Sequence, residues 1–475
     1  MKRKLYNEKM LSTNVNTDIL TRKLFLEKHS PQILQGRHNM KRYINKTIIL
    51  AVILLTGFSG LAKAQDKTQA VNLETVLKLG GANNLTIQEY KQRQELALAN
   101  LAKAKEWWLP DIFAGTTIHQ LWGNAMNTDG RIFTNLDRQS FWGGTGLNAT
   151  LDFGDGIFKA KAAKLKARAS VYQTQAEKNK ALLNIIETYY DFLAAQLNYK
   201  AYEQLVAEAD DLASQIASQV EAELRFESEL LLAKSNSNHM KVEMLNARTQ
   251  YYNMSATLVK LLNLDPVMKL VATETVLAPL ELITTQSMDD SFDSAYQSRP
   301  ELKSMELMLQ SLYEEKKTTT TGLLLPELSV NAKGSYFGDI FNPLDATAEF
   351  NGALLWKIPL GRLTSGGELK QYNARIALQK IQMKQTIAQV NEEVISAREQ
   401  ILAAKEQTEV ALEGSQLGEQ ALKQSIERQQ FGTVRPFEIL QVMEIYIKSR
   451  LNHLKAVSTY NKAQYKLLVA MGNDL

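Results

Sequence analysis

Cysteine is absent from the 475-residue sequence, which excludes disulfide bonds, thiolate chemistry and a lipid anchor on an N-terminal cysteine. Histidine is also scarce, and the five histidines stand far apart with no metal-ligand spacing. The sequence has no nucleophile elbow, zinc-binding motif or glycine-rich phosphate loop, and its acidic residues follow surface helical spacing. We therefore expect no enzymatic activity, no catalytic residue, no cofactor and no bound metal.

Proline is rare as well, with nine residues, while Ala, Leu, Glu, Lys and Gln dominate the second half, as is typical of long-helix proteins. The formal net charge is +4, but the excess of basic residues lies within residues 1–64, and the remainder is weakly acidic. This charge balance does not indicate nucleic-acid binding.

The N-terminal part has the pattern of a secretory signal. A basic stretch beginning at Lys41 precedes an apolar run that is too short to span a bilayer permanently, and the small residues Ala62 and Ala64 follow. This pattern predicts a signal peptide over residues 40–64, cleaved after Ala64. We expect residues 1–39 to be a start-site artefact or an extended basic region of the signal.

Two very long helices are predicted. Between Gly156 and Val220 no proline or glycine interrupts a helical pattern, which corresponds to a helix of about 100 Å. The second helix carries an unbroken heptad seam from Met383 to Leu422. Each helix is expected to reverse at a tip and return, the first to residue 263 and the second to residue 471. Shorter helices are expected over 73–108 and 301–321.

Alternating apolar and polar residues predict two pairs of strands. One extended run is expected after Pro110 as far as Trp122, and a second strand from Phe141 to Phe153, with a polar loop over 123–140 between them. In the second half, residues 328–336 and 350–360 alternate in the same way, on either side of a loop over 338–347. Each strand pair would present one apolar and one polar face. Two strands alone are too few for a stable sheet, so we expect further pairing partners.

The two halves repeat one another. Leu151-Asp152-Phe153-Gly154 leads into a helix, and Ile358-Pro359-Leu360-Gly361 does the same about 207 residues later. The predicted division is a first repeat over 65–263, a connecting segment over 264–300 and a second repeat over 301–475.

The order of these elements resembles the outer-membrane efflux proteins of the TolC family, over roughly residues 70–475. A local motif of that family at each helix tip is a glycine followed six positions later by an acidic residue. The second tip matches it with Gly432 and Glu438, whereas the first keeps an acid at Glu229 but has Glu223 in place of the glycine. The shape of the first tip therefore stays open.

This resemblance implies a mainly α fold with a small β part. In a homotrimer, four strands from each chain would close a twelve-stranded outer-membrane barrel, and long helical hairpins would form a trimeric tube in the periplasm. The protein would lie in the outer membrane of a Gram-negative bacterium, in contact with its lipid and with most of the chain in the periplasm. Four aromatic residues near strand ends are expected to form the membrane girdle: Trp142, Tyr336, Phe337 and Trp356.

The resemblance also implies a function. The trimer would be the outer-membrane duct of a tripartite system that exports drugs or other toxic compounds, together with a periplasmic adaptor and an inner-membrane transporter. That transporter would be a proton-driven pump of the resistance-nodulation-division type, or an ATP-driven (ABC) one. The same kind of duct serves type I protein secretion or metal-ion export, and these remain alternatives. A periplasmic coiled-coil adaptor or scaffold is the alternative outside the family.

Two groups of residues are candidates for this function. Residues at the helix tips are expected to dock the adaptor: Gly432, Thr433, Glu438, Glu223 and Glu229. Charged residues just before the second tip are expected to ring the periplasmic gate, although each would equally suit the solvated flank of a coiled coil: Glu413, Glu419, Lys423, Glu427 and Arg428.

Overall fold

A computed structural model gives the fold of the chain. It describes residues 68–283, 287–339, 343–361, 366–431 and 435–475, and Lys67–Leu475 forms one compact unit. The predicted signal peptide, with Ala62 and Ala64, and the expected start-site segment 1–39 lie outside the described residues.

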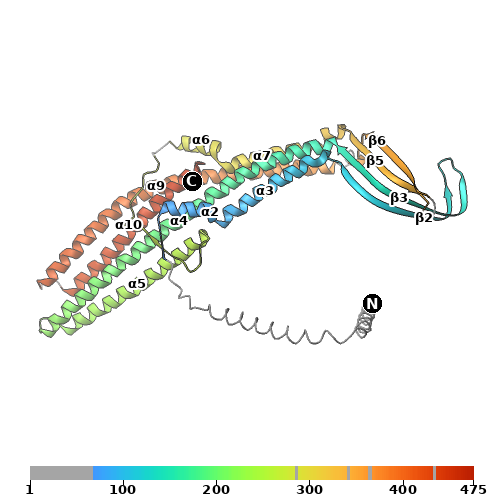
Figure 1. The fold of residues 1–475 in the computed structure, drawn as a ribbon. Helices are drawn as coiled ribbons and strands as arrows, with labels where there is room; N and C mark the ends of the chain where they lie inside the picture. The colour runs from blue at the N-terminus through green and yellow to red at the C-terminus, as the bar shows by residue number, and fades with distance from the viewer. Residues whose placement is uncertain (1–67, 284–286, 340–342, 362–365, 432–434) are drawn as a thin grey trace, which may run out of the picture. The chain divides into compact units, whose positions relative to one another are not determined.

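The same order of elements occurs twice along the chain (Figure 1). The first half contains helices α2 (Leu73–Asn83) and α3 (Leu85–Lys105), strands β2 (Asp111–Met126) and β3 (Ile132–Asp152), and helices α4 (Phe153–Glu221) and α5 (Glu227–Leu261). The second contains helix α7 (Pro300–Thr318), strands β5 (Glu327–Gly338) and β6 (Asp345–Leu355), and helices α9 (Gly367–Gln430) and α10 (Pro436–Ala470). The expectation of a mainly helical chain with a small β part is confirmed.

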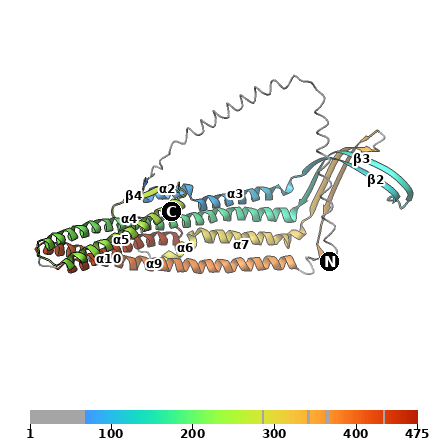
Figure 2. The ribbon, with the colours of Figure 1, turned by 90° about the horizontal axis from the view of Figure 1, so that it is seen from below.

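The long helices pack along one another as their seams predict (Figure 2). With 69 residues, α4 is about 100 Å long. In α9 the heptad seam faces its neighbours, and Val390, Val394, Ala397 and Ala404 are all buried. Helix α10 begins at Pro436. Proline suits the first turn of a helix, because the N–H that it lacks would have no partner within the helix there.

The first helical segment is broken, so the single helix predicted over 73–108 is wrong. Asn84 separates α2 from α3, and its side-chain oxygen accepts hydrogen bonds from the N–H groups of Thr86 and Ile87. Its amide nitrogen donates to the carbonyl of Leu261, 2.8 Å away. Asparagine competes for backbone hydrogen bonds in this way, which makes it a good cap and a poor interior residue. A single 3₁₀ turn, η1 (Glu106–Trp108), then follows α3.

The segment predicted as a loose connection over 264–300 is more ordered than expected. It contains strand β4 (Lys269–Ala272), which pairs in parallel with β1 (Thr68–Val71), and helix α6 (Met288–Ser298). The extended stretch 272–282, called the strap below, lies across α4 and α10. Its backbone pairs with side-chain amides of these two helices.

Three buried carboxamides hold the strap, each with one donated and one accepted hydrogen bond to its backbone. Gln196 of α4 pairs with the N–H and carbonyl of Ala272, at 2.8 and 3.0 Å. Asn461 of α10 donates to the carbonyl of Ala278 and accepts from the N–H of Leu280. Gln464 pairs in the same way with the backbone of residues 280 and 282. These amides satisfy backbone groups that would otherwise be buried without partners.

Four strands form one antiparallel sheet in the order β2-β3-β5-β6, and β3 runs directly into α4. The ladder of β2 and β3 continues to Met126 and Ile132, so the predicted loop over 123–140 shrinks to residues 127–131. A register shift between Gly123 and Ala125, with positive φ at Gly123 and Asn135, lets the two strands stay paired through this Asn- and Gly-rich stretch. The second loop is also shorter than predicted and lies between Gly338 and Asp345.

The largest apolar core lies in the middle of the helices, not at the sheet. Tyr189 and Phe192 of α4 pack there with Leu258 of α5 and Leu270 of β4. A second cluster joins the ends of the two helical hairpins, where Ile216 of α4 packs near Ile439 of α10. The two hairpins are therefore connected both in the middle and at their tips.

Candidate functional site

The first helix tip is a tight C-terminal turn with an unusual residue in it. The N–H of Glu223 donates to the carbonyl of Val220, and the N–H of Leu224 donates to that of Gln219, at 2.9 Å. This is the Schellman arrangement, in which the residue after the cap adopts a left-handed conformation and is usually glycine. Here that residue is Glu223, with φ of 58°. The turn therefore forms although the glycine expected at the tip is missing.

The two tips contact each other through polar side chains. Arg225 donates to the side-chain oxygen of Gln219 at 3.0 Å and lies 3.6 Å from Glu229. The amide of Gln429, at the end of α9, also reaches Gln219, at 3.4 Å. The structure thus places Glu229 in a contact network that sequence patterns did not reveal. Gly432 and Thr433 lie outside the described residues.

Four apolar side chains at the tips are exposed. Leu224 and Phe226 follow the first turn and are 76% and 79% exposed, and Phe431 and Phe437 flank the second tip at 82% and 56%. Glu438 is also exposed, in the first turn of α10. Apolar side chains that gather on a surface in this way indicate a site of protein contact. The sequence did not predict their exposure, because an apolar residue near a helix end equally suits a buried contact.

The five gate candidates share an exposed position near the end of α9: Glu413, Glu419, Lys423, Glu427 and Arg428. Glu419 lies near Glu208 of α4. Burial raises the pKa of Glu208, Arg450 opposes this effect, and the negative charge of Glu419 raises that pKa further. The structure brings Glu419 to the boundary between the two hairpins, and it places all five charges in solvent within one chain.

Polar side chains also connect α10 to α4. Arg450 donates to the side-chain oxygen of Gln204 at 3.2 Å and to the hydroxyl of Tyr446 at 3.1 Å. Farther from the tips, Lys462 lies 2.5 Å from Asp191 and Lys466 lies 3.1 Å from Glu187. These contacts were not predicted, because neither the sequence of α4 nor that of α10 shows that the two helices pack together.

The sheet has one charged and one uncharged face wherever β2, β3, β5 and β6 pair. The register sets Ile112, Leu147, Ala332 and Phe350 side by side, on a face with no charged residue. The opposite face carries all the charged residues of this part of the sheet: Asp111, Asp152, Glu327, Lys333, Asp345 and Glu349. The predicted division into an apolar and a polar face is confirmed.

The register divides the four girdle candidates between the two faces. Trp142 pairs with Phe337 on the polar face, and Tyr336 lies on the uncharged face. Trp356 follows the last residue of β6 and is 60% exposed. A girdle on the uncharged face can therefore include Tyr336 and Trp356, but Trp142 and Phe337 point the other way.

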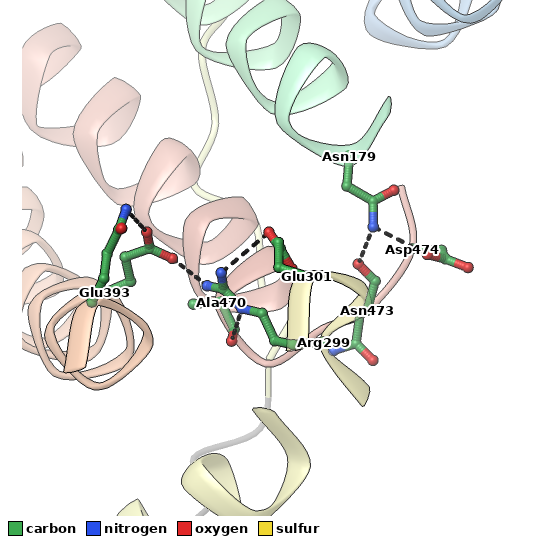
Figure 3. A network of polar contacts seen from close by, with 8 residues as sticks. Asn179, Arg299, Glu301, Glu393, Ala470, Asn473 and Asp474 are labelled. Atoms are coloured by element: carbon green, nitrogen blue, oxygen red, sulfur yellow. Dashed lines mark hydrogen bonds and ion pairs between the residues drawn. The ribbon is translucent and has the colours of Figure 1, made fainter. Parts of the chain in front are cut away.

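A network around Arg299 joins α7, α9 and the C-terminal end of α10 (Figure 3). Arg299 donates to the carbonyl of Ala470 at 2.9 Å and to carboxylate oxygens of Glu301 and Glu393. Its side chain is only 6% exposed, so these bonds compensate for its burial. Nearby, the hydrogen bond from Asn179 is the main cause that lowers the pKa of Asp474, which ties the chain end to α4.

Within the described parts of the chain, no three His, Asp or Glu residues are grouped so that they could hold a metal ion. None of the described helices combines the length and apolar character needed to cross a bilayer.

The first half of this arrangement matches a known family. The model of the outer membrane efflux protein family matches residues 77–264, which extend from α2 to the end of α5. Over these residues the chain is similar to the outer membrane efflux protein family. Members of this family transport rather than transform their substrates, and the chain is not an enzyme. No curated protein sequence matches it.

Solved structures of outer membrane channels share the fold of this chain. The Campylobacter jejuni CmeC outer membrane channel has a TM-score of 0.71 at 17% identity, over 84% of this chain and 85% of that one. The Vibrio cholerae outer membrane protein VceC has a TM-score of 0.69 at 14% identity, over 85% of this chain and 96% of that one. The open state of the Neisseria gonorrhoeae MtrE outer membrane channel has a TM-score of 0.67 at 13% identity, over 84% of this chain and 89% of that one. The fold similarity thus extends well beyond the part that the family model matches.

Proposed function

We propose that this efflux protein is the outer-membrane duct of a tripartite export system, and that three copies form it. The observation that carries the proposal is the separation of charge in the part of the sheet where β3 pairs with β5. One face there has no charged residue, while the other has six. A face of that kind suits lipid, and the opposite face suits a water-filled lumen.

The open edges of the sheet support assembly with other copies. Within the described residues, β2 and β6 each pair on one side only. Unpaired backbone groups cannot face lipid, so a sheet in a membrane must close on itself. Four strands are too few to close, whereas three copies supply the twelve strands that the resemblance implies. The polar face would then line the lumen, with Tyr336 and Trp356 at the lipid interface.

The helices would continue this duct into the periplasm. Because β3 leads into α4 without a loop, the helices begin where the sheet ends. The tips, about 100 Å from that point along α4, would be the adaptor-docking end. We propose that Leu224, Phe226, Phe431 and Phe437 form the apolar part of this docking surface. Gly432, Thr433, Glu438, Glu223 and Glu229 would complete it.

The charges near the end of α9 would ring the gate when three copies come together, and Glu413, Glu419 and Glu427 outnumber Lys423 and Arg428. The bonds of Arg450 to Gln204 and Tyr446 would hold the second hairpin against the first in the closed state. The inner-membrane partner would be a proton-driven pump of the resistance-nodulation-division type, with an ATP-driven transporter as the alternative. The cargo would be drugs or other toxic small molecules, or, with another pump, proteins or metal ions.

Size and solubility test the duct directly. We expect the mature protein, beginning at Gln65, to be extracted from outer membranes only with detergent and to elute as a trimer that conducts ions in a planar bilayer. A soluble monomer or dimer in the periplasmic fraction would contradict the duct and favour the periplasmic scaffold.

Adaptor docking has its own test. Phe226→Asp should abolish cross-linking to the adaptor and drug export while the trimer stays intact. Tyr252→Asp, at another exposed aromatic position on α5, away from the tip, is the control and should keep both. Unchanged export in Phe226→Asp would contradict docking at this tip.

A further inference from the structure

The charges on the polar face of the sheet are strongly unequal in sign. Lys333 is the basic residue of that face where the four strands pair, against five acids: Asp111, Asp152, Glu327, Asp345 and Glu349. If the face lines a lumen, as proposed above, three copies bring three such sets together at close range. Rings of one sign of charge determine which ions a pore admits.

Lys333 is held against the sheet by its neighbours in one cross-strand row. Phe113, Gly146, Lys333 and Glu349 stand side by side on four successive strands. The ammonium of Lys333 lies 2.9 Å from the carboxylate of Glu349. This ion pair is half-exposed, so both charges remain in contact with the lumen water.

Aromatic rings complete the surroundings of Lys333. The ammonium lies 6.0 Å from the centre of the Trp142 ring, within the range of a cation–π contact. The rings of Trp142 and Phe113 are 6.3 Å apart. Gly146 makes room for Phe113, because a Cβ at that position would lie 2.4 Å from the ring. The side chain of Lys333 is therefore fixed in place rather than extended across the lumen.

The other acids are spread along the same face. Glu327 and Asp152 stand opposite each other at the end of the sheet next to α4, where Lys357 lies 2.6 Å from Glu327. Asp345 stands at the opposite end, in the row of Trp142 and Phe337. The excess of negative charge thus extends over the part of the sheet in which β3 pairs with β5.

We propose that the polar face of the sheet makes the duct prefer cations and cationic small molecules over anions, and that Lys333 limits this preference by neutralising Glu349. The inference rests on the proposed duct, because the face must line a lumen for its charges to act. It assigns charge discrimination to the sheet itself, separately from the charged residues near the tips of the helices.

The test is the ratio of potassium to chloride permeability of trimers in a planar bilayer under a salt gradient. Lys333→Gln should raise this ratio about twofold, and Glu349→Gln should lower it by a similar factor. Asp345→Asn provides a second, independent position and should lower the ratio as well. The effects should shrink at 1 M salt, where the screening length is about 3 Å.

Two controls isolate the charge. Lys333→Arg keeps the positive charge and should leave the ratio unchanged. Lys78→Gln removes the same charge from an exposed pair on α2, remote from the sheet, and should also leave it unchanged.

The outcomes separate this inference from the duct itself. If the unmodified chain forms no conducting trimer, the proposed duct fails and the inference fails with it. If it conducts, but the ratio stays the same in Lys333→Gln, Glu349→Gln and Asp345→Asn, the duct stands and the inference is overturned. Shifts of the same sign in Lys333→Gln and Glu349→Gln would overturn it too.

Discussion

Replacing Glu223 with glycine should stabilise the first helix tip. Three of the described helices end in the same Schellman turn, with Glu223 after α4, Asn263 after α5 and Gly472 after α10 as the left-handed residue. Their φ angles are 58°, 49° and 85°. Glycine adopts this conformation freely and asparagine tolerates it, whereas glutamate is strained there.

The expected gain follows from two opposing effects. The left-handed conformation costs an L-residue about 1–2 kcal/mol. Glycine gives back about 0.4–1 kcal/mol, because it increases the conformational entropy of the unfolded chain. The net gain is about 0.5–1 kcal/mol, which corresponds to an about two- to fivefold smaller population of the open turn.

Hydrogen exchange of the Leu224 amide measures this opening, since its N–H closes the turn on the carbonyl of Gln219. Glu223→Ala is the essential control. It removes the acidic charge from the helix C-terminus, where a negative charge is unfavourable, but it keeps the backbone strain. The difference between Glu223→Gly and Glu223→Ala therefore reports the relief of strain less the entropic cost of glycine, without the effect of the charge.

Equal exchange of Leu224 in the two variants would refute the argument. Asn263→Gly provides a graded comparison and should gain less than Glu223→Gly. Gly472→Ala should have the opposite effect, because its Cβ would lie 2.7 Å from the backbone nitrogen of Arg299.

Three further predictions concern the contacts of α10. Arg450→Met should weaken the attachment of α10 to α4 by about 1 kcal/mol and raise the basal conductance of the proposed trimer, whereas Lys448→Met should do neither. Burial lowers the pKa of His453, so the folded state favours its neutral form; the resulting stability is complete above pH of about 6.5 and is lost as the pH falls through the lowered pKa. In His453→Gln the melting temperature should depend less on pH between pH 7 and 5. An unchanged dependence of the melting temperature on pH would contradict this. Asn461→Leu should lower the free energy of unfolding by about 2–3 kcal/mol and speed hydrogen exchange of the Leu280 amide. Asn452→Leu, at an exposed position of the same helix, is the control and should change neither.

Periodic features of the chain could be predicted from sequence. The seam from Met383 to Leu422 and the alternation around Leu147 and Phe350 each depend on one repeating spacing, and a spacing of 3.5 or 2 residues is visible without knowing the partner. The same reasoning failed at residues 123–140. There Asn, Gly and Asp favour a loop, but cross-strand pairing and a bulge keep the chain extended.

Contacts between distant segments were beyond reach of the sequence. Arg299 stands about 90 residues before its partner Glu393, and Gln219 about 210 before Gln429. Nothing local marks either pair. The exposed residues Leu224 and Phe226 were missed for a different reason, because a Leu and a Phe near a helix end equally suit a buried contact.

The amide-held strap has a consequence for how this protein can diverge in sequence. Gln196, Asn461 and Gln464 bind only backbone N–H and carbonyl groups of residues 272–282, and every residue except proline offers both. The strap itself can therefore accept substitutions at its solvent-facing positions without losing its place. Mutation should be tolerated along the segment that is held and rejected at the three positions that hold it. In relatives of this protein, the strap would then be recognisable less by its own residues than by two amides spaced three apart on the last helix.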